Sequence, residues 1–168
     1  MSAVLSKDVA NKDVRRNNKY NQVVDLLVYG KIGDESGAKM PKMFPYIKDL
    51  IVFAAMVGKR FDFQEDVEKE NTGILLGTFE GAAGTRSNSI DQHNLVFMFG
   101  LSVLRDMKYL RDEHVDEVIE IFERYSNGGL SIINDWLRGS AWNPLVILDK
   151  MVDEVSNEDV VAEVVNPF

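Results

Sequence analysis

The strongest constraint on the fold is the segment at residues 47–57, which is hydrophobic on nearly every side of a helix. Ile47, Leu50, Ile51, Ala54 and Val57 recur at helical spacing, and the opposite side carries Val52, Phe53 and Met56. Because a helix that is apolar all round must be buried, this segment predicts a central helix. Gly58 is predicted to end it.

Similar periodicity predicts further helices along the chain. Their approximate ranges are 13–29, 92–105, 112–127, 130–139 and 144–152. Asn127 and Gly128 are typical of a helix end, so two separate helices are expected on either side of them. A strand is the competing interpretation for residues 95–101, because short apolar runs are ambiguous by period alone.

The sequence therefore predicts a mainly α protein, a compact single-domain bundle of five to seven helices. Alternating residues favour one small β-hairpin at about 60–79. We expect a flexible N-terminus at residues 1–12, one helical domain at 13–152 and an acidic C-terminal tail at 153–168. A final helix is the alternative for that tail.

Composition excludes several classes of site. The chain has no cysteine, which rules out disulfides, thiolate nucleophiles and zinc–cysteine centres. No apolar run reaches the roughly 20 residues of a membrane helix, and the N-terminus does not resemble a signal peptide. We therefore expect a cytoplasmic protein without membrane contact.

Charge is unevenly distributed. Residues 1–60 hold 11 Lys/Arg and 6 Asp/Glu (+5), whereas residues 61–168 hold 8 and 21 (−13), which sum to −8. A sequence pI near 4.8 argues against non-specific nucleic-acid binding. Either the two parts attract each other, within the fold or between subunits of a homo-oligomer, or the basic part contacts DNA. The candidate nucleic-acid contacts are Arg15, Arg16, Lys19, Lys59, Arg60 and Arg86.

Other patterns give little chemistry. His93 and His114 lie among acidic or polar residues, where an exposed or capping histidine is the simpler interpretation than a metal ligand. The carboxylates at positions 113, 116, 117, 120 and 123 share one helix face, which is most simply solvated. The glycine-rich segment 77–86 lacks the Gly-Lys-Ser/Thr ending of a P-loop. We therefore predict no catalytic residue, no metal and no cofactor.

Two segments resemble a known family, the small accessory proteins of bacterial DNA phosphorothioation (Dnd) systems. The first contains Ala54, Ala55 and Gly58 followed by two basic residues, and it is similar to one signature of that family. The second is Glu120-Ile-Phe-Glu-Arg-Tyr-Ser-Asn-Gly-Gly-Leu130, with Ser126 in place of the usual alanine. Its motif residues are Phe122, Glu123, Tyr125, Gly128 and Gly129.

The resemblance implies an accessory role in a DNA sulphur-modification or restriction system that acts in phage defence. It implies that the protein is not an enzyme and that its partners are other proteins of such a cluster. It leaves open whether the protein contacts DNA. Two alternatives remain from the residues alone. One is a small DNA-binding transcriptional regulator, and the other is a metal-dependent hydrolase that uses His93 or His114.

Overall fold

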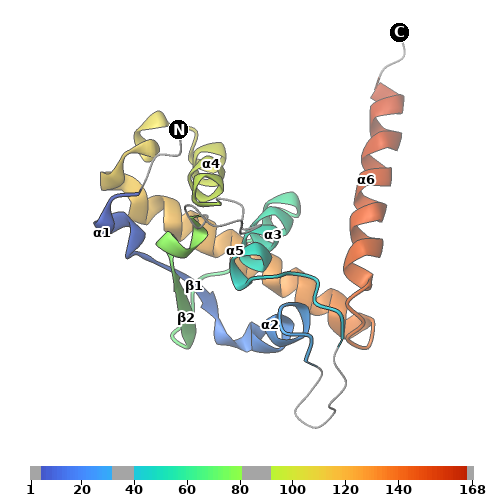
Figure 1. Cartoon of the computed structure of the whole chain (residues 1–168). Coiled ribbons are helices and arrows are strands. Elements are labelled where there is room, and N and C mark those ends of the chain that lie inside the picture. Colours follow the sequence, from blue (N-terminus) through green and yellow to red (C-terminus); the bar gives the residue numbers. More distant parts are fainter. Residues whose placement is uncertain (1–4, 32–39, 81–91, 166–168) are drawn as a thin grey trace, which may run out of the picture.

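The long helix α5, Val115–Gly139, is the axis of the molecule, and the other elements pack around it (Figure 1). A computed structural model describes residues 5–31, 40–80 and 92–165, with side chains to residue 156. The helices are α1 Lys7–Ala10, α2 Asn21–Leu27, α3 Ile47–Arg60, α4 His93–Leu104, α5 and α6 Val146–Val165. The two strands are β1 Asp13–Asn17 and β2 Asn71–Leu75. The predicted mainly α fold is confirmed.

The core lies between α5 and the two helices that cross it, α3 and α4. Leu50 and Ala54 of α3 are fully buried, as the apolar periodicity predicts. Phe122 of α5 packs edge-to-face against Phe99 of α4, with ring centroids 5.6 Å apart. Aromatic pairs of this geometry stabilise a core beyond the area that they bury. The α3 segment is thus the central helix that its composition predicts.

The prediction at residues 13–29 is wrong in its first part. Asp13–Asn17 is a strand and not a helical turn, although the stripe predicted to follow it, at Tyr20, Val23, Val24 and Leu27, is buried. β1 pairs antiparallel with β2, with Val14 opposite Ile74. The small β-element within 60–79 therefore exists, but its partner strand lies far earlier in the sequence. Local periodicity cannot detect such a long-range pairing.

Two predicted helix ends are also wrong. α5 continues through Asn127, Gly128 and Gly129, and α3 continues past Gly58 to Arg60. A Cβ added at Gly128 would lie 2.1 Å from the carbonyl oxygen of Phe63. Glycine is required there because another part of the backbone comes into contact with the helix. The glycines that are typical of a helix end therefore serve close packing in the middle of α5.

The C-terminal segment forms one helix. The helix predicted at 144–152 continues to Val165 as α6, so residues 153–165 belong to it and the alternative of a final helix holds. In Figure 1, α6 rises beside α3 and stands away from the rest of the fold. At the other end of the chain, α1 inserts the buried Val9 into the core.

Candidate functional site at the junction of β1 and α5

The two segments that carry the family resemblance lie against each other, where α3 crosses α5. A Cβ added at Gly129 would lie 1.7 Å from the carbonyl oxygen of Ala54, and one at Gly58 would lie 2.1 Å from that of Tyr125. No side chain fits at either position, so the two helix backbones are in direct contact. Ala54 and Ala55 are also fully buried. These motif residues therefore determine helix packing.

A second set of α5 residues completes the hydrogen bonding of β1. One edge of β1 pairs with β2, and the other edge faces Glu123 and Asn127, which are four residues apart on one face of α5. Glu123 accepts hydrogen bonds from the backbone N–H of Arg15 at 2.7 Å and from its guanidinium at 2.9 Å through each carboxylate oxygen. Side chains of a helix thus take the place of a third strand.

Glu123 corrects the sequence interpretation of the acidic face of α5. Its side chain is fully buried, whereas that of Arg15 is 48% exposed. The bidentate pairing supplies the compensation that a buried carboxylate requires. The hydrogen bond and the charge of Glu123 raise the pKa of the Arg15 guanidinium. Glu123 is therefore a structural anion at this junction and not part of a solvated face.

Asn127 provides the other half of the contact. Its side-chain oxygen accepts from the backbone N–H of Asn17 at 2.8 Å, and its amide donates to the carbonyl oxygens of Glu123 at 2.9 Å and Arg15 at 3.3 Å. Asn17 is fully buried and reaches the next segment through its own side chain, which donates to Glu65 at 2.8 Å. The buried polar groups of Asn17 are thus paired.

Replacing Asn127 with alanine should lower the free energy of unfolding by about 1–3 kcal/mol, because the buried N–H of Asn17 loses its acceptor. Chemical denaturation followed by circular dichroism measures the change. Asn134→Ala, seven residues further along the same helix, is the matched control and should alter stability by less than about 0.5 kcal/mol. Equal effects of the two substitutions would contradict the role given to Asn127.

Tyr20 extends the same hydrogen-bond network through Glu65. Its hydroxyl donates to Glu65 at 2.6 Å, and its side chain is 4% exposed. Burial, and then the hydrogen bond to Glu65, raises the pKa of Tyr20 to about 12. Lys19 neutralises the same carboxylate at 2.9 Å and contacts Glu68 at 2.5 Å.

The raised pKa of Tyr20 predicts a loss of stability at alkaline pH. The folded state holds this proton more tightly than the unfolded state, in which the pKa is about 10. The contribution is therefore complete below pH ~10 and is lost as the pH rises towards about 12. Denaturation midpoints measured across this range should fall in the wild type and fall less in Tyr20→Phe. Parallel curves for the two proteins would exclude Tyr20 as the cause.

A polar groove of ≈ 700 Å³ opens beside the junction. Its charged lining residues are Lys12, Asp13, Arg15, Asp66, Asp116, Glu120, Glu123 and Arg124. Five carboxylates thus face three cations. Lys12 binds Asp116 at 2.8 Å and Arg15 binds Glu123 at 2.9 Å. The groove presents no excess of positive charge to a phosphate.

Four of the basic residues proposed as nucleic-acid contacts bind partners within the described part of the chain. Arg15 and Lys19 are ion-paired as described, and Arg60 binds Glu154 at 3.1 Å. The Lys59 ammonium donates to the Ser102 hydroxyl at 2.6 Å and lies over the ring of Phe99. Arg86 lies outside the described residues.

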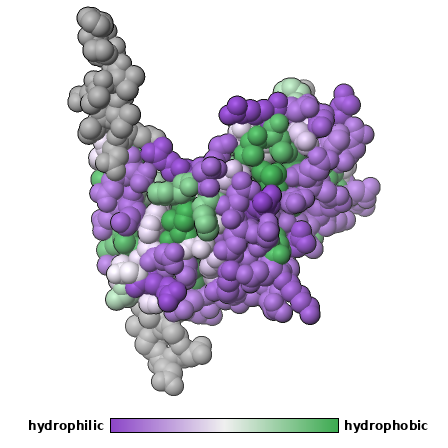
Figure 2. All heavy atoms as spheres, turned by 180° about the vertical axis from the view of Figure 1, so that it is seen from behind, coloured by the Kyte–Doolittle hydropathy of each residue, from purple (hydrophilic) through white to green (hydrophobic). Residues whose placement is uncertain are grey.

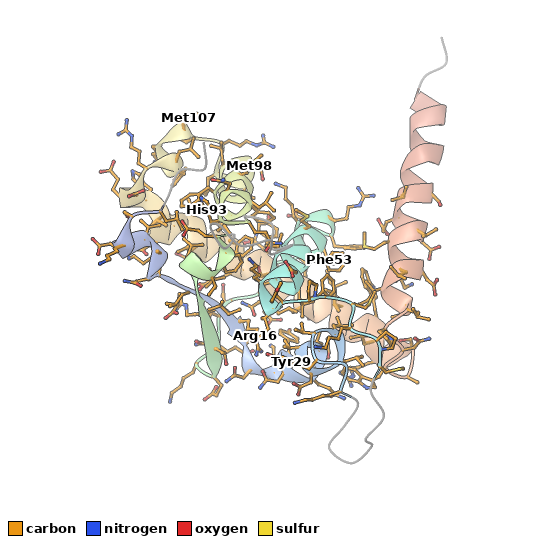
Figure 3. All side chains as sticks on the ribbon, in the orientation of Figure 1. Arg16, Tyr29, Phe53, His93, Met98 and Met107 are labelled. Carbon is orange, nitrogen blue, oxygen red and sulfur yellow. The ribbon has the colours of Figure 1, made fainter. Side chains whose placement is uncertain are left out.

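Arg16 differs from these four residues because its side chain is buried. Its side chain is 7% exposed, lies towards α2 near Tyr29 (Figure 3) and donates to Asn21 at 2.6 Å. Burial lowers the pKa of its guanidinium, and the charge of Asp25 opposes this effect. A buried guanidinium of this kind cannot contact DNA without a change in the fold.

These contacts explain the uneven distribution of charge along the sequence. Lys12, Arg15, Lys19 and Arg60 of the basic N-terminal part all bind carboxylates of the acidic part. The two parts therefore attract each other within one fold, which is one of the interpretations that the sequence allowed. Each of these four cations would have to leave its carboxylate before it could bind a phosphate.

The two histidines lie in different surroundings. His93 is 1% exposed at the start of α4 (Figure 3), whereas the Nδ1 of His114 lies 3.0 Å from Glu117 at the surface. His114 lowers the pKa of the Glu117 carboxyl through this hydrogen bond. Among the side chains of residues 5–31, 40–80 and 92–156, no three of His, Asp or Glu are arranged to hold a metal ion. Most of the glycine-rich segment 77–86 lies outside the described residues.

Sequence reasoning missed the residues that join the network, namely Asn17, Glu65 and Asn127. Asn127 was expected to cap a helix, and Glu65 and Asn17 carried no local pattern. The one available signal is the i, i+4 spacing of Glu123 and Asn127 on a helix whose next turn is glycine-rich. That spacing places both polar side chains beside the close helix crossing.

The structure thus defines a mainly α protein with a two-stranded sheet attached to the long helix α5. The family model of DNA sulphur modification system-associated protein 4 matches residues 14–165. The chain belongs to this family, so the resemblance found in the two signature segments is confirmed. Searches among curated proteins and among solved structures gave no match. No described helix is long and apolar enough to cross a membrane.

Proposed function

We propose that the chain is a non-catalytic accessory protein of a DNA sulphur-modification or restriction system in the cytoplasm, and that it acts through protein partners in phage defence. Membership of the DNA sulphur modification system-associated family supports the system. The proposal that the protein is not catalytic is supported by the contacts that the signature residues make. Gly58, Gly129 and Glu123 all serve contacts inside the protein.

The alternative of a DNA-binding regulator requires cations that are available to phosphates. Arg15, Lys19 and Arg60 would first have to leave their carboxylates. Each such exchange costs an internal ion pair, so DNA affinity gained through them would be small and strongly salt-dependent. This argument favours a protein partner over DNA.

Co-purification tests the proposal. The full chain, tagged and expressed in a host that carries a complete sulphur-modification cluster, should retain a protein encoded in that cluster. Fluorescence anisotropy with plain and phosphorothioated duplexes should give weak binding at moderate salt. Tight duplex binding that is lost in Lys59→Ala/Arg60→Ala, without a retained cluster protein, would replace the proposal with direct DNA recognition.

A further inference from the structure

Four apolar side chains at the start of α6 and just before it are exposed in the described structure. Leu145, Leu148, Val152 and Val155 are 58, 53, 64 and 58% exposed. Leu148, Val152 and Val155 are spaced by four and three residues, which places them along one side of α6, and Leu145 directly precedes the helix. We call these four residues the α6 stripe. Exposed apolar side chains gathered in this way mark an interaction surface.

The α6 stripe continues into a groove between α6 and α3. The groove has a volume of ≈ 280 Å³, and Val155 is part of its lining together with Met56, Phe61 and Met151. Met56 and Phe61 are 52 and 43% exposed. Figure 2 shows a hydrophobic area on this face, beside α6. Stripe and groove together have the shape that receives the apolar side of one further helix.

Charge determines what kind of helix fits. The sequence of α6 contains six acidic residues and one lysine, a net charge of −5. Asp149 and Asp153 are exposed next to the stripe and have no ion-pair partner among the described residues. Two copies of α6 side by side would repel each other, and DNA or an anionic surface would be repelled as well. A cationic partner is attracted.

We propose that the α6 stripe and the adjoining groove bind a basic amphipathic helix of a partner protein. The apolar side of that helix covers Leu148, Val152 and Val155, and its Lys or Arg residues face Asp149 and Asp153. The proposal rests on the proposed function, since it names the surface by which this accessory protein holds its partner. It also accounts for an acidic α6 that stands away from the fold (Figure 1).

The first test uses a defined probe and the full chain. A fluorescent peptide of about 18 residues, with leucine on one face and lysine on the other, represents the partner helix. Anisotropy should show saturable, salt-sensitive binding, and a matching leucine–glutamate peptide should not bind. The substitutions Leu148→Ser/Val152→Ser should weaken binding about tenfold or more. Asp149→Lys/Asp153→Lys should abolish the preference for the basic peptide.

Met98→Ser/Met107→Ser is the matched control. These methionines are 63 and 68% exposed but lie on α4 and after it, away from α6 (Figure 3). The control should keep wild-type affinity, and circular dichroism should show that all variants stay folded. The proposal would be overturned if Leu148→Ser/Val152→Ser and Met98→Ser/Met107→Ser lost equal affinity for the basic peptide, or if neither lost any. A dimer in light scattering that Leu148→Ser/Val152→Ser dissociates would overturn it as well, because the occupant would then be a second copy.

A co-purification separates this proposal from the proposed function. If the wild type and Leu148→Ser/Val152→Ser both retain the same cluster protein, the docking surface is wrong and the accessory role stands. If the wild type retains no cluster protein, the accessory role fails, while the peptide measurement still decides whether the surface binds a basic helix. The expected result is retention by the wild type and by Met98→Ser/Met107→Ser alone.

Discussion

Gly129→Ala should lower the free energy of unfolding by about 3 kcal/mol or more. The new methyl carbon would lie 1.7 Å from the carbonyl oxygen of Ala54, 2.5 Å from its carbonyl carbon and 2.9 Å from the nitrogen of Gly58. All three are backbone atoms of α3, so no side chain can rotate to make room. Alanine favours helix over glycine by only about 1 kcal/mol, and the clash therefore dominates.

Gly139→Ala is the control for this prediction. Gly139 ends the same helix, and a Cβ there meets no atom within 4 Å. The control should be neutral or stabilise by up to about 1 kcal/mol. Thermal and urea denaturation of the two variants measure the difference. A Gly129→Ala protein as stable as Gly139→Ala would mean that α3 and α5 are not in backbone contact.

The sequence predicted the parts of the fold that depend on local periodicity. The central helix at 47–60 and the helix at 92–105 were located within a few residues. Both have apolar side chains on most faces, and such segments can only be stable when buried. The same reasoning found the stripe of α2, although it assigned the preceding strand to a helix.

Glycine explains the errors at helix ends. Gly58 and the pair Gly128–Gly129 have the composition of helix ends, yet both lie inside helices. A single sequence cannot show whether a glycine is present for its backbone freedom or for its missing side chain. Only the position of the other helix decides, and that is a tertiary property.

The candidate site could be predicted only as a set of separate residues. Arg15 was identified as a cation and Glu123 as an acid, but their pairing joins positions 108 residues apart. An acidic side chain on a charged helix face is normally exposed, and the strand that buries Glu123 was not predicted. The exposure of the α6 stripe could not be predicted either, because apolar residues at helical spacing are normally expected to face the core.

Arg15→Met should cost about 3–5 kcal/mol, because it leaves a buried carboxylate without its counter-ion. Glu123 is fully buried and would keep only the hydrogen bond from the backbone N–H of residue 15. Glu123→Gln should cost less, about 1–2 kcal/mol, since the half-exposed guanidinium of Arg15 can turn to water. The double variant should be more stable than Arg15→Met alone, because no unpaired charge remains buried.

Urea denaturation of the wild type, the two single variants and the double variant gives the coupling energy of the pair. Lys12→Met is the matched control, because it removes the neighbouring ion pair between Lys12 and Asp116. The side chain of Lys12 is 40% exposed and that of Asp116 is 72% exposed. Exposed pairs contribute about 1 kcal/mol or less, so this variant should stay close to the wild type. If Arg15→Met is no more destabilising than Lys12→Met, water reaches Glu123, and the β1–α5 junction is not a buried support that joins the sheet to α5.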